Sequence, residues 1–296
     1  MPLHKWQNDQ ASGLRRMVLS KPVHVIAVSS GKGGVGKTNV SVNLAITLAM
    51  SGKEVMLMDA DLGLANVDML LGIQSKYNLF HVLTGERTLS EIVISGPSGI
   101  QIVPAASGIK KMSELTEAEN VGIVRAFEEL SHDLDFLLID TAAGISDNVI
   151  RFCCSAQEVV VVLCDEPASI TDAYALIKIL SRDYGLEHFN ILANMVYSYQ
   201  QGRILFKKLL RVTDRFLDVT LRHLDPVPYD KNLRKAVQQL QPVVVAYPGS
   251  ASSLAFNKLA KTISRWPIPE NSGGRIEFFL ERLLRYQSAA TPASVT

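Results

Sequence analysis

Residues 31–38 read Gly31-Lys32-Gly33-Gly34-Val35-Gly36-Lys37-Thr38, which matches the phosphate-binding pattern G-x-x-x-x-G-K-[ST]. The context also fits, because the apolar run Val23–Val28 precedes the motif and a helical pattern starting at Asn39 follows it. Glycines let backbone N–H groups curl around an anion, and a helix N-terminus adds partial positive charge. The stretch therefore predicts a strand, a phosphate-binding loop and a helix, in that order.

Three residues of this loop carry its expected chemistry. Lys37 should reach the β- and γ-phosphates of a nucleotide, and the Thr38 hydroxyl should ligate Mg²⁺. Lys32 is a second lysine that an ordinary phosphate loop does not need, and it could be only a solvated charge. A lysine at this point, however, is directed along the phosphates and away from its own helix. A cation delivered from a facing subunit could neutralise transition-state charge, as an arginine finger does.

Outward from the loop, short apolar runs alternate with segments of helical length and spacing. The runs expected to be strands are Val23–Val28, Val55–Met58, Ile100–Val103, Phe136–Ile139, Val159–Cys164 and Phe189–Ala193. The segments expected to be helices include Asn39–Met50, Glu117–Leu130, Ile170–Tyr184 and Arg203–Phe216. Runs that are apolar on both faces suit parallel strands covered by helices. The alternation predicts an α/β fold: a single P-loop NTPase domain with a doubly wound, mostly parallel sheet.

Carboxylates follow two of the expected strands. Asp59 and Asp61 come at the end of Val55–Met58, and Asp140 follows the apolar run Phe136–Ile139, which is the Walker B form. The carboxyl ends of parallel strands meet at the edge where such sheets bind ligands. Asp140 would hold Mg²⁺ through a water, Asp61 would orient the attacking water, and Asp59 would support the metal shell. The alternative for the Asp59 and Asp61 pair is a solvated turn.

Composition argues against several other classes. With 47% hydrophobic residues the chain can fill a core, and its formal net charge of +1 gives no bulk attraction for nucleic acid. The three cysteines, Cys153, Cys154 and Cys164, form no C-x-x-C pair, so a disulfide framework or a structural zinc site is poorly supported. The first residues do not form a secretory signal, and no apolar window reaches the roughly 18 residues of a membrane span. We expect a cytoplasmic protein that could touch a membrane only from its surface.

Taken together, these motifs resemble the MinD/ParA family of deviant Walker A ATPases. The extra lysine of the loop, Lys32, is the family's signature, and the Asp-x-Asp motif and Asp140 agree with it. The resemblance runs from about Val23 to Arg265. It implies an enzyme that hydrolyses ATP slowly to ADP and phosphate with Mg²⁺. It also implies a sandwich homodimer formed with ATP, in which Lys32 crosses to the partner's nucleotide and Asp61 serves the hydrolytic water.

The same resemblance implies residues at the base and the ribose. Asn194 would read adenine, Pro228 would border the base, and Glu166 would approach the partner's ribose. Asn194 and Glu166 could equally be polar residues of strand-end loops. The nucleotide-binding set implied in this way is Gly31, Lys32, Gly33, Gly34, Val35, Gly36, Lys37, Thr38, Asn194, Pro228 and Glu166.

Within the family, several short stretches of this sequence are similar to sequences of the branch that regulates flagellar number. These stretches are Asp59–Asp68, Ile139–Gly144, Cys164–Pro167, Ser169–Ala175 and the N-terminal Asp9–Arg15. The branch implies partners: an FlhF-type GTPase engaged through Asp9–Arg15 and a flagellar master transcription regulator of the FleQ type, with no direct contact to nucleic acid. One departure is Ala142, where MinD proteins have a proline, so the loop after Asp140 could move differently.

The two ends of the chain differ from its centre. The predicted parts are a flexible partner-binding segment at 1–20, the ATPase domain at 21–266, a linker and helix at 267–287, and a disordered tail at 288–296. One face of the helical pattern in the third part is apolar, with Ile276, Phe279, Leu280, Leu283, Leu284 and Tyr286. Such a helix could pack on the protein's own core. It could instead be a reversible anchor, peripheral on the inner membrane at the cell pole.

Other functions remain open at this point. A ParA-type DNA-partition ATPase would need a basic surface, which the near-neutral charge does not favour. A redox enzyme like the nitrogenase iron protein would need cysteines that bridge the dimer, and Cys153 and Cys154 are the candidates. A GTPase is disfavoured because no N-K-x-D motif is present. An ATP-controlled dimer switch is the hypothesis that the motifs favour.

Overall fold

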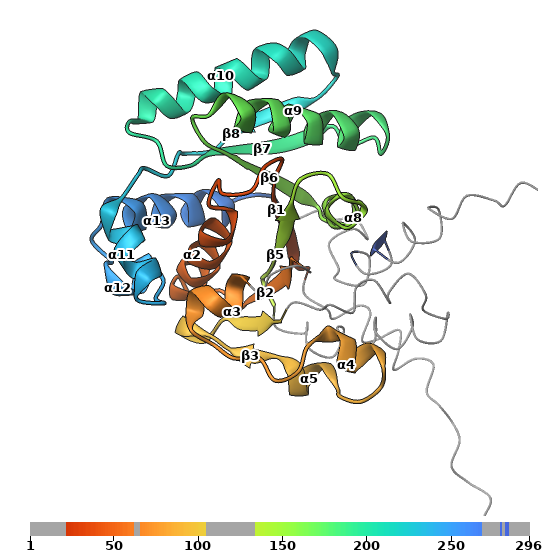
Figure 1. Ribbon diagram of the computed structural model, residues 1–296, viewed down its shortest axis with the longest axis vertical. Helices are drawn as coiled ribbons and strands as arrows, with labels where there is room; N and C mark the ends of the chain where they lie inside the picture. Colours follow the sequence, from red (N-terminus) through yellow and green to blue (C-terminus); the bar gives the residue numbers. More distant parts are fainter. Residues whose placement is uncertain (1–21, 62–65, 105–133, 268–278, 280–281, 284–296) are drawn as a thin grey trace, which may run out of the picture.

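Eight strands form one sheet at the centre of the computed structural model, which describes residues 22–61, 66–104, 134–267, 279 and 282–283 (Figure 1). Their order is β3-β4-β2-β5-β1-β6-β7-β8, and neighbours run parallel except β3 with β4. The strands are β1 (His24–Ser30), β2 (Val55–Ala60), β3 (Ile94–Ser95), β4 (Gln101–Val103), β5 (Phe136–Ala143), β6 (Glu158–Leu163), β7 (His188–Ala193) and β8 (Thr220–His223). The chain winds outward from β1 in both directions.

Helices cover both faces of this sheet (Figure 1). The described helices are α2 (Lys37–Met50), α3 (Asn66–Leu71), α4 (Leu79–Leu83), α5 (Leu89–Ile92), η1 (Pro97–Gly99), α8 (Asp147–Ser155), α9 (Pro167–Arg182), α10 (Tyr199–Phe216), α11 (Lys231–Gln238), α12 (Val243–Ala246) and α13 (Ala251–Ile263). Two buried apolar clusters result, one under α2, α3 and α11 to α13, the other under α4, α5 and α8 to α10.

The central strand shows why both faces must be apolar. Val25 and Ala27 of β1 lie in one cluster, whereas Ile26 and Val28 lie in the other. Successive residues of a strand point to opposite faces, so a strand between two helical layers needs an apolar residue at every position. The continuous apolar runs in the sequence follow from this double burial.

Asp230 organises the last helices of the described fold. Its Oδ1 accepts a hydrogen bond from the backbone N–H of Asn232 at 2.8 Å, which begins α11. Its Oδ2 accepts from the backbone N–H and hydroxyl of Ser252, at 2.9 and 2.7 Å, at the start of α13. One carboxylate therefore joins the beginnings of two helices, and α13 packs against α2, the helix that follows the phosphate loop.

The predicted α/β architecture is confirmed. All six predicted apolar runs coincide with strands, and three of the predicted helices overlap α2, α9 and α10. The predicted helix Glu117–Leu130 and the segment 1–20 lie outside the described residues. β8 was not predicted, because its residues alternate between exposed and half-buried at the edge of the sheet and form no apolar run.

Two residues of the expected C-terminal amphipathic helix are buried in the core. Phe279 and Leu283 expose 2% and 3% of their surface and belong to the cluster under α8 and α9, while Arg282 is exposed. Residues four apart lie on the same face of a helix. The alternative in which the helix packs on the protein's own core therefore holds for these residues, and the rest of that helix lies outside the described part. Within the described residues, no helix is long and apolar enough to cross a membrane.

Replacing Leu283 with alanine should destabilise the whole domain. Removing a buried leucine side chain typically costs about 2–5 kcal/mol, because the lost contacts leave a cavity. We expect a decrease of this order in the free energy of unfolding of the nucleotide-free protein, measured by urea denaturation. Arg282→Ala, at the exposed neighbouring position, is the control and should change it by less than about 0.5 kcal/mol. Equal stability of Leu283→Ala and wild type would show that Leu283 contributes nothing to the core.

Candidate active site

The phosphate loop connects the end of β1 to the start of α2. Gly34 and Gly36 have φ values of 82° and 84°, in the left-handed region that favours glycine. Gly36 is also the N-cap residue of α2, and because it has no side chain it leaves the first N–H groups of the helix uncapped. The first N–H groups of a helix have no partner within the helix, so these donors face the loop and can bind an anion.

Gly31 has a different role, which is close packing. A Cβ atom at Gly31 would lie 2.1 Å from the carbonyl carbon and oxygen of Asp172 in α9, closer than any real contact. The first glycine of the motif thus lets α9 lie directly against the phosphate loop. Any larger residue at position 31 would push the loop and α9 apart.

Lys37 is held by a buried carboxylate. Its Nζ lies 3.2 Å from Oδ1 of Asp140, and the two residues expose 7% and 0% of their surface. Ser41 adds a hydroxyl hydrogen bond of 2.8 Å to the same oxygen. A buried carboxylate needs such compensation, because leaving water is costly for a charge. Sequence reasoning missed Ser41, although its position four residues after Lys37 places both on one face of α2.

The arrangement of acidic oxygens suits a divalent cation. Asp59 of β2 lies directly opposite Asp140 of β5 in the sheet register. The second oxygen of Asp140, Oδ2, is buried without a hydrogen-bond partner in the part of the chain that the structure describes. Mg²⁺ prefers oxygen ligands and usually takes one or two carboxylates together with phosphates and water. An unpartnered carboxylate oxygen beside the phosphate loop therefore fits the predicted metal site, to which Thr38 of the first turn of α2 would contribute its hydroxyl.

Burial raises the pKa of Asp59 from 3.8 to about 7, and the nearby charge of Asp140 adds to this. Hydrogen bonds act in the other direction: Asp59 accepts from the backbone N–H groups of Asp61 at 3.0 Å and Val67 at 3.2 Å. Without a cation, Asp59 therefore titrates near neutral pH and not in the usual range of a carboxyl group.

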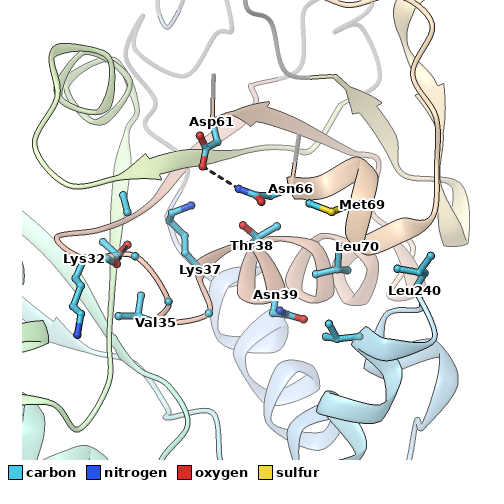
Figure 2. Close-up of a pocket in the computed structure, with 16 residues that line it drawn as sticks. Lys32, Val35, Lys37, Thr38, Asn39, Asp61, Asn66, Met69, Leu70 and Leu240 are labelled. Atoms are coloured by element: carbon cyan, nitrogen blue, oxygen red, sulfur yellow. Dashed lines mark hydrogen bonds between the residues drawn. The ribbon is translucent and has the colours of Figure 1, made fainter. Parts of the chain in front are cut away.

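Asp61 lines a cavity of about 590 Å³ together with the phosphate loop (Figure 2). Its Oδ2 accepts a hydrogen bond of 3.0 Å from the side-chain amide of Asn66, the first residue of α3. Figure 2 shows Asp61 and Asn66 across the cavity from Lys37 and Thr38. The cavity extends between Met69 of α3 and Leu240 after α11. The structure thus brings the predicted water-orienting residue to the mouth of the phosphate site.

Lys32 pairs with Glu166 of the same chain. The Lys32 ammonium donates to Oε2 of Glu166, the N-cap residue of α9, and this hydrogen bond raises the pKa of Lys32. Both side chains are substantially exposed, at 38% and 56%. Figure 2 shows Lys32 directed away from Lys37. Two residues that were each expected to serve a partner subunit therefore contact each other on the exposed rim of the site.

Asn194 and Pro228 lie at a second cavity, of about 310 Å³, on the other side of Gly36. A β-bridge between Val196 and Pro228 joins Pro228 to the segment that follows β7. Sequence reasoning missed three further lining residues, Tyr229, Leu233 and Arg234. Leu233 and Arg234 belong to α11 and Tyr229 precedes it, and the short amphipathic pattern of this helix was not predicted.

The cysteines do not form a surface site. Cys153 and Cys154 of α8 are buried in the apolar cluster, and burial raises the pKa of each thiol to about 12. Cys164 is buried after β6. Side chains that face the core cannot bridge a dimer, so their placement does not support the redox alternative. Within the described residues, no group of three or more His, Cys, Asp or Glu could hold a metal ion on its own.

A glycine loop between β1 and α2, with Asp59 and Asp140 on neighbouring parallel strands, defines a P-loop NTPase site. The chain matches the ParA family, described as NUBPL iron-transfer P-loop NTPase, over residues 21–264, and it belongs to that family. As a member it is an ATPase. The family that Lys32 and the acidic motifs indicate in the sequence is thereby confirmed.

Individual proteins of known name are similar to this chain over most of its length. The chain is 53% identical over 278 residues to the antiactivator FleN of Pseudomonas aeruginosa, covering 94% of this chain and 99% of that protein. It is 32% identical to the flagellum site-determining protein YlxH of Helicobacter pylori, covering 88% and 90%. The solved structure of MinD from Pyrococcus horikoshii, complexed with Mg-ADP, is similar with a TM-score of 0.62 at 25% identity, covering 82% of this chain and 96% of that one.

The raised pKa of Asp59 predicts a pH-dependent stability of the nucleotide-free protein in a chelator. Because the folded state holds this proton more tightly than the unfolded state, the associated stability is complete below pH 3.8 and is lost as pH rises through about 7. Wild type should lose on the order of 2 kcal/mol of unfolding free energy between pH 5 and pH 8 from this group. Asp59→Asn should have a flatter profile, measured by urea denaturation at each pH.

Asp214→Asn is the control for this experiment, because Asp214 is exposed on α10. It should keep the wild-type pH profile. Identical profiles for Asp59→Asn and wild type would contradict the assignment of the proton to Asp59. The comparison uses the change with pH and not the absolute stability, since asparagine cannot accept both backbone hydrogen bonds equally well.

Proposed function

We propose that this chain is an ATP-controlled dimerisation switch that regulates flagellar number or placement, and flagellar gene expression, through protein partners. The observation that carries the proposal is the 53% identity to FleN over 94% of the chain. The similarity to YlxH, which is named for flagellum site determination, favours the same conclusion. DNA partition remains the second candidate, but a net charge of +1 gives it no electrostatic support.

Each described site residue has a role in the proposed ATPase cycle. Lys37 and the first N–H groups of α2 bind the phosphates of ATP. Thr38 and Asp140 hold Mg²⁺, with Asp59 beside them, and Mg²⁺ when bound neutralises charge on the phosphates. Asp61 is kept at the cavity by Asn66 and orients the attacking water. Asn194 and Pro228 contact the adenine in the second cavity.

Dimerisation completes the site in this proposal. Lys32 leaves Glu166 of its own chain and reaches the phosphates of the partner's nucleotide, while Glu166 approaches the partner's ribose. The intrachain pair is exposed, and exposed ion pairs contribute little to stability because water and salt screen them. Exchange of this weak contact for one with a triphosphate is therefore favourable only when ATP is present on the facing subunit.

Mixing two inactive variants tests whether Lys32 acts across the dimer. Lys32→Ala should bind ATP but hydrolyse it at least about 100-fold more slowly, since a cation supplied in trans can contribute 10³ or more. Asp61→Ala should also bind ATP and lose hydrolysis, because water activation commonly contributes about 10²–10⁴. In a mixed dimer, the Lys32→Ala subunit receives Lys32 from its Asp61→Ala partner. Random mixing should restore about a quarter of wild-type turnover, one working site in half of the dimers.

The two variants are mixed without nucleotide, and the rate of phosphate release from ATP is measured for each variant alone and for the mixture. Lys178→Ala, at an exposed lysine of α9, is the matched control and should keep wild-type turnover. If the mixture remains as inactive as its components, Lys32 acts within its own chain or not at all. Full activity of Lys32→Ala by itself would remove Lys32 from the mechanism.

The two ends of the chain would connect this cycle to partners and membrane. Residues 1–20 would form the flexible segment whose Asp9–Arg15 element engages an FlhF-type GTPase, and a FleQ-type regulator would bind elsewhere. The domain of 21–266 would be followed by the 267–287 segment, whose Phe279 and Leu283 are docked in the core. ATP-driven dimerisation would release this segment to the inner membrane, which population shift permits.

Expression in Pseudomonas aeruginosa that lacks FleN tests the cellular role. This chain should return the number of flagella per cell to the wild-type value, counted by electron microscopy. Lys37→Ala should not, because it removes the cation that binds the β- and γ-phosphates. Immunoblots must show both proteins at equal levels. A flagellar count that is the same with and without the wild-type chain would contradict the proposed function.

A further inference from the structure

Asn194 connects the two cavities of the nucleotide site. It follows β7 directly, exposes only 4% of its surface, and is fixed there because its backbone N–H donates to the carbonyl of Leu163 in β6 at 2.8 Å. Its side-chain Nδ2 donates a 2.8 Å hydrogen bond to the backbone carbonyl of Val35, in the middle of the phosphate loop. A residue directly after β7 thus contacts the phosphate loop, although the two residues are 159 positions apart in the chain.

The loop is shaped to accept this contact. A Cβ atom on Gly36 would lie 2.5 Å from Nδ2 of Asn194, so only glycine lets the loop approach the amide. Gly36 also has a φ of 84°, which other residues rarely adopt. Gly34 and Gly36 on either side of Val35 have no side chains to restrain the backbone. A glycine-rich segment has a high conformational entropy to lose, so an external hydrogen bond is an efficient way to fix it.

We propose that Asn194 is a positioning residue that holds the phosphate loop in its anion-binding shape, in addition to contacting the base. The inference rests on the proposed nucleotide site and deepens it. The amide donates to Val35 on the loop side, and its carbonyl oxygen is the acceptor that it can offer to the exocyclic amine of adenine. Base binding and phosphate binding then share one side chain, so occupation of the base cavity reinforces the shape of the loop.

A ligand without a base separates the two roles. Inorganic triphosphate with Mg²⁺ occupies only the phosphate site, whereas ATP with Mg²⁺ occupies both. Asn194→Ala removes the donor and leaves the Val35 carbonyl without its partner, which corresponds to a loss of about tenfold or more in affinity. We expect this loss for triphosphate as well as for ATP, measured by isothermal titration calorimetry. Leu233→Ala, which lines the base cavity, is the control and should weaken ATP but leave triphosphate binding unchanged.

Amide hydrogen exchange distinguishes a loop-holding role from a general contribution to folding. In Asn194→Ala, peptides covering residues 31–37 should exchange faster, while those covering β5 should exchange as in wild type. Faster exchange in both would indicate general destabilisation and overturn the proposal. If Asn194→Ala does not fold, Asn194→Asp keeps the shape of the side chain but places an acceptor against the Val35 carbonyl. That variant should lose triphosphate binding at least as strongly.

The outcomes of the titrations separate this inference from the proposed function. Wild-type affinity of Asn194→Ala or Asn194→Asp for triphosphate, with weakened ATP binding, would show that Asn194 contacts only the base and would overturn the inference alone. Wild-type protein that binds neither ligand would overturn the proposed function and the inference together. Parallel loss of both ligands in the Asn194 variants, with loss of ATP alone in Leu233→Ala, supports the inference.

Discussion

The ion pair between Lys37 and Asp140 is the interaction on which the site depends. Two carboxylates, Asp59 and Asp140, lie opposite each other towards the ends of β2 and β5, and Lys37 forms an ion pair with Asp140. Burial is the main cause of the raised pKa of Asp59, and the like charge of Asp140 adds to it. Asp59 is therefore partly protonated near neutral pH in the apo site, which reduces the negative charge beside Asp140. In the proposed ATPase cycle, Asp140 would help to hold Mg²⁺, which would neutralise charge at this site, and Lys37 would bind the phosphates.

Contacts around this pair extend its influence to the rest of the fold. Gly31 lets α9 lie against the phosphate loop, and the N-cap residue of α9 is Glu166, the partner of Lys32. α9 also covers the apolar cluster in which Phe279 and Leu283 are buried. A change at the nucleotide can therefore reach both the exposed rim and the docked C-terminal residues through a single helix. This route is short, and it gives the proposed coupling between ATP, dimerisation and the release of that segment a physical path.

The sequence predicted those elements of the fold that depend on neighbouring residues in the chain. Strands buried on both faces must be apolar throughout, so all six core strands could be found, and the glycine pattern identified the phosphate loop. The remainder depends on contacts between distant residues. Ser41 reaches Asp140 across 99 positions, and Asn194 reaches Val35 across 159, and neither partner is visible from spacing alone. β8 and α11 were missed because an edge strand and a short amphipathic helix carry weak apolar signals. The Lys32–Glu166 pair could not be predicted either, since the resemblance indicated both residues for a partner subunit.

Sedimentation velocity of the wild-type protein tests the central claim most directly. If Lys32 remains paired with Glu166 until an ATP-loaded subunit faces it, the oligomeric state should depend on the bound nucleotide. With Mg²⁺ and a non-hydrolysable ATP analogue, the protein should sediment as a dimer, and with Mg²⁺ and ADP it should sediment as a monomer. A monomer in both nucleotides, with the analogue shown to be bound, would contradict the account. A dimer of equal stability in ATP analogue, ADP and apo protein would contradict it as well, because the nucleotide would then control nothing.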